Sequence, residues 1–397
     1  MNKKYVIFGV IALVVLLSFV IQRYIGDIRP LFSPSSDITL ERTKSTPKPG
    51  SKAAFDEVDL TVPDGYRIGL FAEDLGNARD LQFTPAGTLL ISDTSGGNVR
   101  ALPDANQDLV ADENKIILEN LNKPHGLAFY ENKLYVVEET QVVRYSWNEE
   151  TRTAAQEQKI LDLPAGGRHF SRSMIFDDQG NLYISLGSTC DVCVEKEAWI
   201  GTTIITNAQG QNPRVFAKGL RNAVFLTQDA EGNIFGTEMG RDFLGDTTPP
   251  DEINLLTDGG DYGWPLCYGN KVHDTEFDTN TYIRDPCEDT IAPAYEIPAH
   301  SAPLGLTFVE STQMPDDWQN DLLVVYHGSW NRTTPTGYKV VRLNRDGNKF
   351  TSEEDLVTGF LKGSTAAARP ADVTFDEAGS LFISDDKSGA VYVMINN

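Results

Sequence analysis

The chain has 397 residues, a length that fits one large domain or two ordinary ones. It carries 57 acidic residues against 34 basic ones, which gives a formal net charge of −23. This charge repels phosphate backbones and anionic lipid surfaces, so composition argues against nucleic acid as a partner. An anionic ligand would therefore need a local group of arginines that overcomes the overall field.

The N-terminal segment, residues 1–28, is predicted to be a membrane anchor or signal. Lys3 and Lys4 precede an uncharged run over residues 5–21, about the minimum length for a bilayer-spanning helix. The two lysines favour an N-terminus inside, so the rest of the chain would face the periplasm or the cell exterior. No small-residue cleavage site follows the run, which favours an uncleaved anchor over a removed signal that would leave a secreted protein. Residues 29–58, rich in Ser, Pro, Lys and Thr, are predicted to be a flexible linker.

Residues 59–397 contain one unit that recurs: a short apolar stretch, a turn that usually contains glycine, and a β-rich run. The copies span residues 79–93, 125–139, 172–186, 222–238, 304–327 and 371–386. The Asp/Asn-Gly turns are typical of hairpins, and a spacing of 46 to 50 residues between the first four copies matches one four-stranded blade per repeat. The sequence therefore predicts an all-β fold, a six-bladed β-propeller with an N-terminal transmembrane helix.

One strand-like segment, residues 66–71, has no partner in its own repeat. We expect it to complete the last blade by pairing with residues 390–395 and so to close the ring. The interval between the fourth and fifth copies is longer than the others, and its surplus lies over residues 245–300. This excursion is expected to form part of a lid or pocket rim.

The four cysteines fall into two sequence-local pairs, Cys190 with Cys193 and Cys267 with Cys287. Two disulfides are the leading interpretation for an exported chain. A redox-active or zinc-binding Cys-x-x-Cys motif is the alternative for the first pair. Val194 stands where a haem-attachment motif needs histidine, which excludes covalent c-type haem at that position.

Polar residues recur where the innermost strands of the predicted blades begin. Four of the six copies carry one at the equivalent position: Arg79, His125, Arg172 and Asn222. Arg369 lies two residues before the equivalent position of the sixth copy, and His169 lies three residues before Arg172. Because equivalent positions of all blades face one ring, these side chains are expected at one mouth of the central channel. The alternative is a solvated rim with scattered charges.

The stretch over residues 219–254 joins a basic side chain to an oxygen-rich loop. Arg221 and Asn222 precede an apolar run, and residues 238–252 form a loop rich in Gly, Asp and Pro. Such a loop can offer carbonyl and carboxylate oxygens to Ca²⁺ beside an arginine that binds an anion. The stretch predicts a site for an anionic cofactor with Ca²⁺, and the alternative is a surface salt bridge next to a long connection.

Five motifs, taken together, resemble those of a known protein family. They are His169 with Arg172, GLRN at 219–222, GRDFLGDTTPPDE at 240–252, HGSWNR at 327–332 and RPADV at 369–373. From about Pro63 to the C-terminus the chain resembles the sorbosone dehydrogenase and soluble glucose dehydrogenase family of quinoprotein sugar dehydrogenases. The resemblance implies a six-bladed propeller that uses pyrroloquinoline quinone (PQQ) and Ca²⁺.

The resemblance also implies residue roles. Arg221, Arg332 and Arg369 would bind the carboxylates of PQQ, and Asn222 would hydrogen-bond its ring system. The main-chain carbonyls of Gly240 and Arg241 would bind Ca²⁺. The glucose-oxidising branch has proline at the second of these positions, a difference that a carbonyl ligand tolerates.

His169 is the expected general base, which takes the substrate hydroxyl proton while hydride passes to the quinone. Arg172 and Arg221 are grouped with it as catalytic residues. The expected substrate is a sugar or sugar-derived aldehyde, sorbosone-like or aldose-like. Because the chain has no haem motif, an external electron acceptor, a cytochrome or a quinone, is also expected.

Two other functions remain open on the same fold. A metal-dependent, gluconolactonase-like hydrolase would need a carboxylate-rich metal site at the channel centre, and the ring of arginine and histidine argues against it. A non-catalytic binding propeller would take up no cofactor and would expose a large apolar face elsewhere. The fold alone does not decide among these functions.

Overall fold

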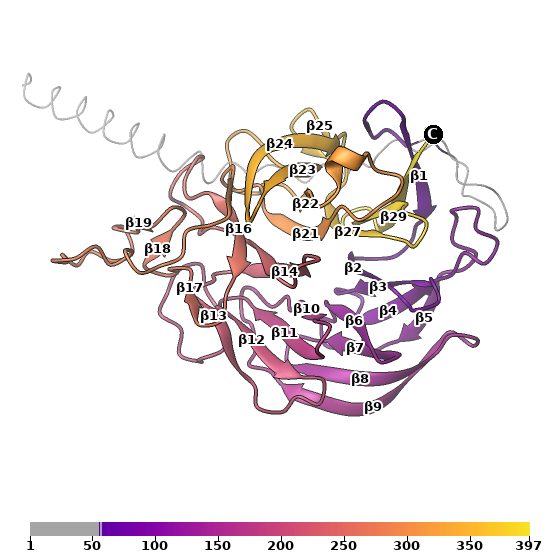
Figure 1. Ribbon diagram of the computed structural model, residues 1–397, viewed down its shortest axis with the longest axis horizontal. Helices are drawn as coiled ribbons and strands as arrows, with labels where there is room; N and C mark the ends of the chain where they lie inside the picture. Colours follow the sequence, from indigo (N-terminus) through magenta and orange to yellow (C-terminus); the bar gives the residue numbers. More distant parts are fainter. Residues whose placement is uncertain (1–54, 56–57) are drawn as a thin grey trace, which may run out of the picture.

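The computed structural model describes residue 55 and residues 58–397, and these residues form a ring of blades (Figure 1). The predicted anchor and nearly all of the predicted linker lie outside the described residues. In the part of the chain that is described, no helix is both long enough and apolar enough to cross a membrane.

The first three blades follow one another along the chain. The first contains β2 (Ala78–Phe83), β3 (Leu89–Asp93), β4 (Asn98–Leu102) and β5 (Lys115–Leu118). The second contains β6 (Leu127–Tyr130), β7 (Lys133–Val137), β8 (Gln141–Asn148) and β9 (Thr153–Asp162). The third contains β10 (Met174–Phe176), β11 (Asn181–Leu186), β12 (Thr202–Asn207) and β13 (Arg214–Lys218), to which β17 (Gly260–Asp261) adds in parallel.

The fourth blade contains β14 (Ala223–Gln228), β15 (Ile234–Glu238), β16 (Asp251–Leu256) and β20 (Tyr295–Ile297). The fifth contains β21 (Pro303–Phe308), β22 (Leu322–Tyr326), β23 (Lys339–Asp346) and β24 (Lys349–Val357). Short elements lie between strands of these two blades or follow the fifth blade. They are β18 (Cys267–Tyr268), β19 (Val272–His273), the 3₁₀ turn η1 (Asp316–Trp318), β25 (Leu361–Lys362) and β26 (Thr365–Ala366). The six-bladed all-β architecture expected from the repeats is confirmed within residues 58–397.

The sixth blade joins the two ends of the ring. It consists of β27 (Pro370–Phe375), β28 (Leu381–Asp385), β29 (Ala390–Asn396) and, at its outer edge, β1 (Tyr66–Ala72). β1 pairs antiparallel with β29, so the predicted closure is confirmed, and Figure 1 shows the two strands side by side.

Apolar side chains fill the space between neighbouring blades. Phe235 of β15 meets Phe308 of β21 with ring centroids 5.3 Å apart. Phe382 of β28 packs edge-on against Phe83 of β2 at 5.2 Å. These contacts explain the alternating and fully buried strands of the repeats, because each blade covers one face of the next.

The strand directions place particular loops at one end of the ring. Successive strands of a blade run antiparallel, so the loop entering an innermost strand and the loop between the second and third strands open at the same end. Four innermost strands also shift register near their start, in β2, β14, β21 and β27. Such irregularities re-aim side chains at the point where the strands begin.

Both predicted disulfides are present, Cys190–Cys193 and Cys267–Cys287. The second lies in the excursion between β16 and β20. Trp264 and Tyr268 of that excursion line a small cavity next to Arg241, and the predicted role of the excursion as a lid or pocket rim stays a prediction.

Two buried carboxyl groups on neighbouring innermost strands are coupled. Asp372 Oδ2 of β27 accepts a hydrogen bond from the N–H of Leu81, the residue after Asp80 in β2, at 2.8 Å. Burial raises the pKa of Asp372 to about 7. Burial and then the charge of Asp372 raise the pKa of Asp80 well above its ordinary value. Ionising both groups is therefore unfavourable in the folded ring.

We expect Asp372→Asn to stabilise the protein at pH 8.5 but much less at pH 5. A carboxyl group with a raised pKa in the folded state contributes stability at low pH that is lost as pH rises through about 7. Asparagine keeps an oxygen acceptor for Leu81 and removes the charge, for a gain on the order of 2 kcal/mol at high pH. Thermal unfolding at both pH values measures the difference, with the exposed Asp178→Asn as control. Equal differences at the two pH values would contradict the coupling.

Candidate active site

A cavity of about 200 Å³ opens at the end of the ring where these loops meet. Four residues predicted from the sequence lie in its lining: His169, Arg221, Asn222 and Gly240. They come from loops entering β10 and β14 and from the loop between β15 and β16, which the strand directions place at one end. A larger groove, about 940 Å³, lies between the first and sixth blades and contains none of the predicted site residues.

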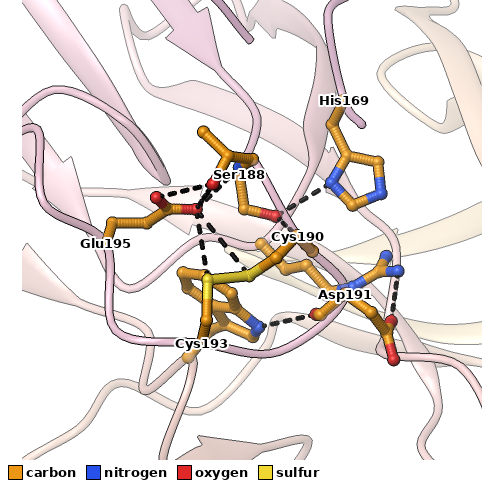
Figure 2. Close-up of a disulfide and its surroundings, with 9 residues drawn as sticks. His169, Ser188, Cys190, Asp191, Cys193 and Glu195 are labelled. Carbon is orange, nitrogen blue, oxygen red and sulfur yellow. Dashed lines mark hydrogen bonds and ion pairs between the residues drawn. A yellow bond between two sulfur atoms is a disulfide. The ribbon is translucent and has the colours of Figure 1, made fainter. Parts of the chain in front are cut away.

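His169 is held by the end of strand β11. Its Nδ1 lies 2.8 Å from Ser188 Oγ, and its main-chain N–H donates to Ser188 O at 3.2 Å (Figure 2). Burial, then the positive charges of Arg221 and Arg168, lower its pKa to about 3. The imidazole is therefore neutral near pH 7 and can accept a proton.

Gly187 permits this close approach. A Cβ at this position would lie 2.7 Å from His169 Cβ and 2.5 Å from Asn222 Oδ1. Any other residue would displace one of these two side chains. The end of β11 thus sets the separation between the expected base and the amide.

Arg172 lies behind the cavity, in the interior of the loop that carries His169. Its Nη1 donates to His169 O at 2.9 Å and its Nη2 to Pro164 O at 3.2 Å, and the side chain is fully buried. Burial lowers its pKa to about 10. Arg172 is absent from the cavity lining, so the structure gives it a role in bracing the loop, in place of the expected position at the mouth.

Arg221 binds protein groups on two sides. Its Nε donates to Asp191 O at 2.9 Å and its Nη2 to Asp191 Oδ1 at 2.7 Å. The same Nη2 lies 3.2 Å from Asp242 Oδ2, and Nη1 donates to Met239 O at 3.2 Å. The buried Asp242 and the partly buried Asp191 thus hold the guanidinium at the cavity wall.

Asp242 connects several residues that the sequence reasoning did not single out. Its Oδ2 accepts from Arg168 Nη2 at 2.6 Å, and its Oδ1 accepts from Asn331 Nδ2 at 2.6 Å. His300, whose Nε2 lies 2.8 Å from Gly245 O, completes this side of the cavity. Asn331 is buried.

The carboxyl group of Glu238 precedes the predicted Ca²⁺ ligands in the chain. Glu238 Oε1 accepts the main-chain N–H groups of Arg221 and Asn222 at 2.7 and 2.9 Å. Its Oε2 is buried, and no described residue donates a hydrogen bond to it. A buried carboxylate oxygen without a partner suits a cation better than an apolar neighbour.

Gly240 and Arg241 lie next to this carboxylate in the chain. The N–H of Gly240 donates to Asp251 Oδ1 at 2.9 Å, and a Cβ at Gly240 would lie 2.7 Å from Pro250 O. The side chain of Arg241 pairs with Asp274 at 2.6 Å and lines the small cavity beside the excursion. The main-chain carbonyl of Arg241 therefore remains its predicted contribution to a metal site.

Arg332 and Arg369 are not among the residues that line the cavity. Arg332 Nη1 donates to Ala299 O at 3.1 Å. Arg369 Nη1 donates to Gly328 O at 2.9 Å and Nη2 to Tyr338 OH at 3.1 Å. Arg332 belongs to the loop that carries Trp330, and Arg369 hydrogen-bonds to residues of that loop, so the direct contact of either arginine with a cofactor stays a prediction.

A comparison with known proteins shows to which family the chain belongs. A family model described as TrAA12-like matches residues 60–397. The chain belongs to the TrAA12-like family. The match covers every strand of the propeller and therefore includes the whole candidate site.

Two sequence relatives of this TrAA12-like chain share between about a quarter and 29% of their aligned residues with it. A protein of Borreliella burgdorferi, named only as uncharacterized, is 29% identical over 355 residues, 84% of this chain and 90% of its own. The pyrroloquinoline quinone-dependent pyranose dehydrogenase of Coprinopsis cinerea is 24% identical over 84% of this chain. The match covers 54% of that enzyme, so this chain spans about half of its length.

Among solved structures, the calcium structure of the Trichoderma reesei Carbohydrate-Active Enzymes Family AA12 protein superposes with a TM-score of 0.75. The two chains are 21% identical, and the superposition covers 87% of this chain and 99% of that one. This similarity confirms the propeller fold. The name of the C. cinerea relative also agrees with the resemblance to quinoprotein sugar dehydrogenases.

Proposed function

We propose that this TrAA12-like protein is a quinoprotein dehydrogenase that oxidises a sugar or sugar-derived aldehyde with PQQ as its cofactor. The observation that carries the proposal is the neutral His169 next to Arg221 and Asn222 in one cavity. The named activity of the C. cinerea relative supports it.

The residues of the cavity fit PQQ. A planar tricarboxylate needs several hydrogen-bond donors around a narrow site. The guanidinium groups of Arg168 and Arg221 and the amides of Asn222 and Asn331 lie in one lining, together with the carboxyl groups of Asp242 and Asp251. Arg168 has a side chain that is 40% exposed, so it can meet an anion at the mouth.

The loop after β15 also fits Ca²⁺. The unpartnered Oε2 of Glu238 and the carbonyls of Gly240 and Arg241 are hard oxygen donors of the kind that Ca²⁺ prefers. The calcium structure of the T. reesei relative supports the assignment. An ion bound there would act as a Lewis acid towards the cofactor.

The roles of the chain's own residues follow from their hydrogen bonds. When bound, PQQ would accept a hydride from the substrate carbon that carries the hydroxyl group. His169 takes the hydroxyl proton on Nε2, because its Nδ1 is engaged with Ser188. Arg172 braces the loop of His169, and Arg221, whose guanidinium is fixed by Asp191 and Asp242, would face an anionic group at the cavity wall.

The substrate class extends to sorbosone-like or aldose-like molecules, and the electrons leave to an external cytochrome or quinone. We further propose that residues 1–28 anchor the protein in a membrane and residues 29–58 tether residues 59–397 on its outer side. The charged start of the chain before an uncharged run supports this location. Two disulfides, typical of oxidising compartments, support it as well.

The test adds PQQ and Ca²⁺ to the purified full-length protein and screens aldoses, sorbosone and simple alcohols for dye reduction. We expect reduction that requires both PQQ and a sugar and that falls when a chelator removes Ca²⁺. Hydrolysis of a sugar lactone without PQQ would favour the hydrolase. Failure to bind PQQ with no turnover of any substrate would favour a binding propeller.

A further inference from the structure

A chain of two hydrogen bonds ends at the ring of His169. Ser188 Oγ lies 2.8 Å from His169 Nδ1 and 2.6 Å from Cys190 O (Figure 2). A hydroxyl group has one proton, and a carbonyl oxygen can only accept. The Ser188 proton therefore goes to Cys190 O, and Ser188 Oγ must accept its second hydrogen bond from a protonated Nδ1.

This direction decides which nitrogen of His169 is free. A neutral imidazole with its proton on Nδ1 carries its lone pair on Nε2. Among residues 58–397, no protein group forms a hydrogen bond with His169 Nε2, and His169 lines the cavity. The opposite tautomer would present an N–H to the cavity and could not accept a proton there.

The carbonyl of Cys190 is held in place from several sides. The Cys190–Cys193 disulfide closes the short turn that contains it. Next to it, Asp191 O accepts from Arg221 Nε at 2.9 Å and from Trp264 Nε1 at 3.3 Å. The N–H of Ser188 donates to Arg221 O at 2.7 Å. The carbonyl of Cys190 and the hydroxyl of Ser188 are thus both fixed before any ligand binds.

A hydroxyl partner orients a histidine without adding a charge. A carboxylate at this place would also select the Nδ1–H tautomer, but it would raise the basicity of the ring. Ser188 is fully buried and neutral, and the charged groups that face His169 are Arg221, Arg168 and Asp191. The ring therefore keeps its neutral form beside two arginines.

We propose that Ser188, held by the carbonyl of Cys190, is a positioning residue that keeps His169 as the Nδ1–H tautomer with Nε2 free to accept a proton. The catalytic consequence rests on the proposed dehydrogenase function. The tautomer is a property of the protein alone.

The first test measures the tautomer directly in the full-length protein without cofactor. Nitrogen-15 NMR of histidine-labelled protein at pH 7 distinguishes protonated from unprotonated ring nitrogens, and His169→Gln identifies the signal. We expect a protonated Nδ1 and an unprotonated Nε2. A protonated Nε2 in the wild-type protein would overturn the proposal, whether or not any variant folds.

The second test uses Ser188→Ala, Ser188→Thr and a matched control. Ser185→Ala removes another buried hydroxyl from β11, one that accepts from Ser173 N–H at 3.2 Å and does not contact His169. We expect Ser188→Ala to mix the two tautomers, Ser188→Thr to restore the wild-type spectrum and Ser185→Ala to leave it unchanged. An unchanged spectrum in Ser188→Ala would also overturn the proposal.

Turnover then separates this proposal from the proposed function. With PQQ and a sugar that the wild-type protein oxidises, Ser188→Ala should lower kcat about 10-fold, on the scale of other outer-shell histidine partners, with little change in KM. Absence of dye reduction in the wild-type protein together with the expected spectrum would refute the dehydrogenase and leave the tautomer assignment standing. Wild-type dye reduction together with a protonated Nε2 would support the dehydrogenase and overturn the tautomer assignment.

Discussion

His169→Gln is expected to lower turnover by about 10²- to 10⁴-fold, the usual contribution of a positioned general base. The glutamine amide can occupy a similar volume, but it cannot accept a proton at the position of Nε2. PQQ should still bind, because Arg221 and Asn222 remain in the cavity wall. Dye reduction gives kcat, and an absorbance titration with PQQ gives its Kd.

The control for this substitution is His273→Gln. His273 is a half-buried histidine of the excursion, paired with Asp278 at 3.0 Å and absent from the cavity lining. The His273→Gln variant should retain wild-type turnover. Normal turnover in His169→Gln would show that the base is assigned to the wrong residue.

Arg221→Ala is expected to weaken PQQ binding about 100-fold, a loss of about 3 kcal/mol, within the range for truncating one partner of a buried charge pair. The same change leaves Asp191 and Asp242 without their shared guanidinium. A buried carboxylate that loses its partner is costly, so the melting temperature should also fall. Titration with PQQ and thermal unfolding measure the two effects separately.

Arg342→Ala separates cofactor binding from stability. Arg342 forms a comparably buried ion pair with Asp321 at 2.6 Å in the fifth blade and does not line the cavity. The Arg342→Ala substitution should lower the melting temperature without changing the Kd for PQQ. Equal losses of PQQ affinity in Arg221→Ala and Arg342→Ala would mean that Arg221 acts through stability alone.

Most of the fold could be predicted from the sequence, because each blade is a local unit. The turn at residues 177–181 and the strands on either side of it are close in sequence, and their pattern repeats in every copy. The pairing of β1 with β29 could be inferred because residues 66–71 had no other partner. The register irregularities at the starts of the innermost strands left no trace in the pattern.

The site was predictable only in part, because the direction of a long side chain depends on contacts formed in the folded protein. His169 and Asn222 lie where the repeat pattern placed them, in one cavity. Arg172 occupies an equivalent position in its repeat but bends back to the carbonyls of its own loop. Arg369 lies against Tyr338, a residue whose position no local pattern indicates.

Asp242 shows a different limit of the sequence. It belongs to the recognised GRDFLGDTTPPDE segment, yet its value lies in joining Arg168, Arg221 and Asn331, which are far apart in the chain. Charge complementarity in an acidic chain could have indicated that a buried arginine such as Arg221 pairs with a carboxylate. It could not have indicated which of the 57 acidic residues serves.

The pairing of β1 with β29 has a consequence for biosynthesis. Among the strands that the structure describes, β1 is made first and β29 last, and β29 is the strand that β1 pairs with in the sheet. Five blades can form their hairpins before β29 is made, whereas the circle closes only after residues 390–396 have left the ribosome. A premature stop before residue 390 would therefore leave exposed edges at both β1 and β28, and such truncated chains should be prone to aggregation.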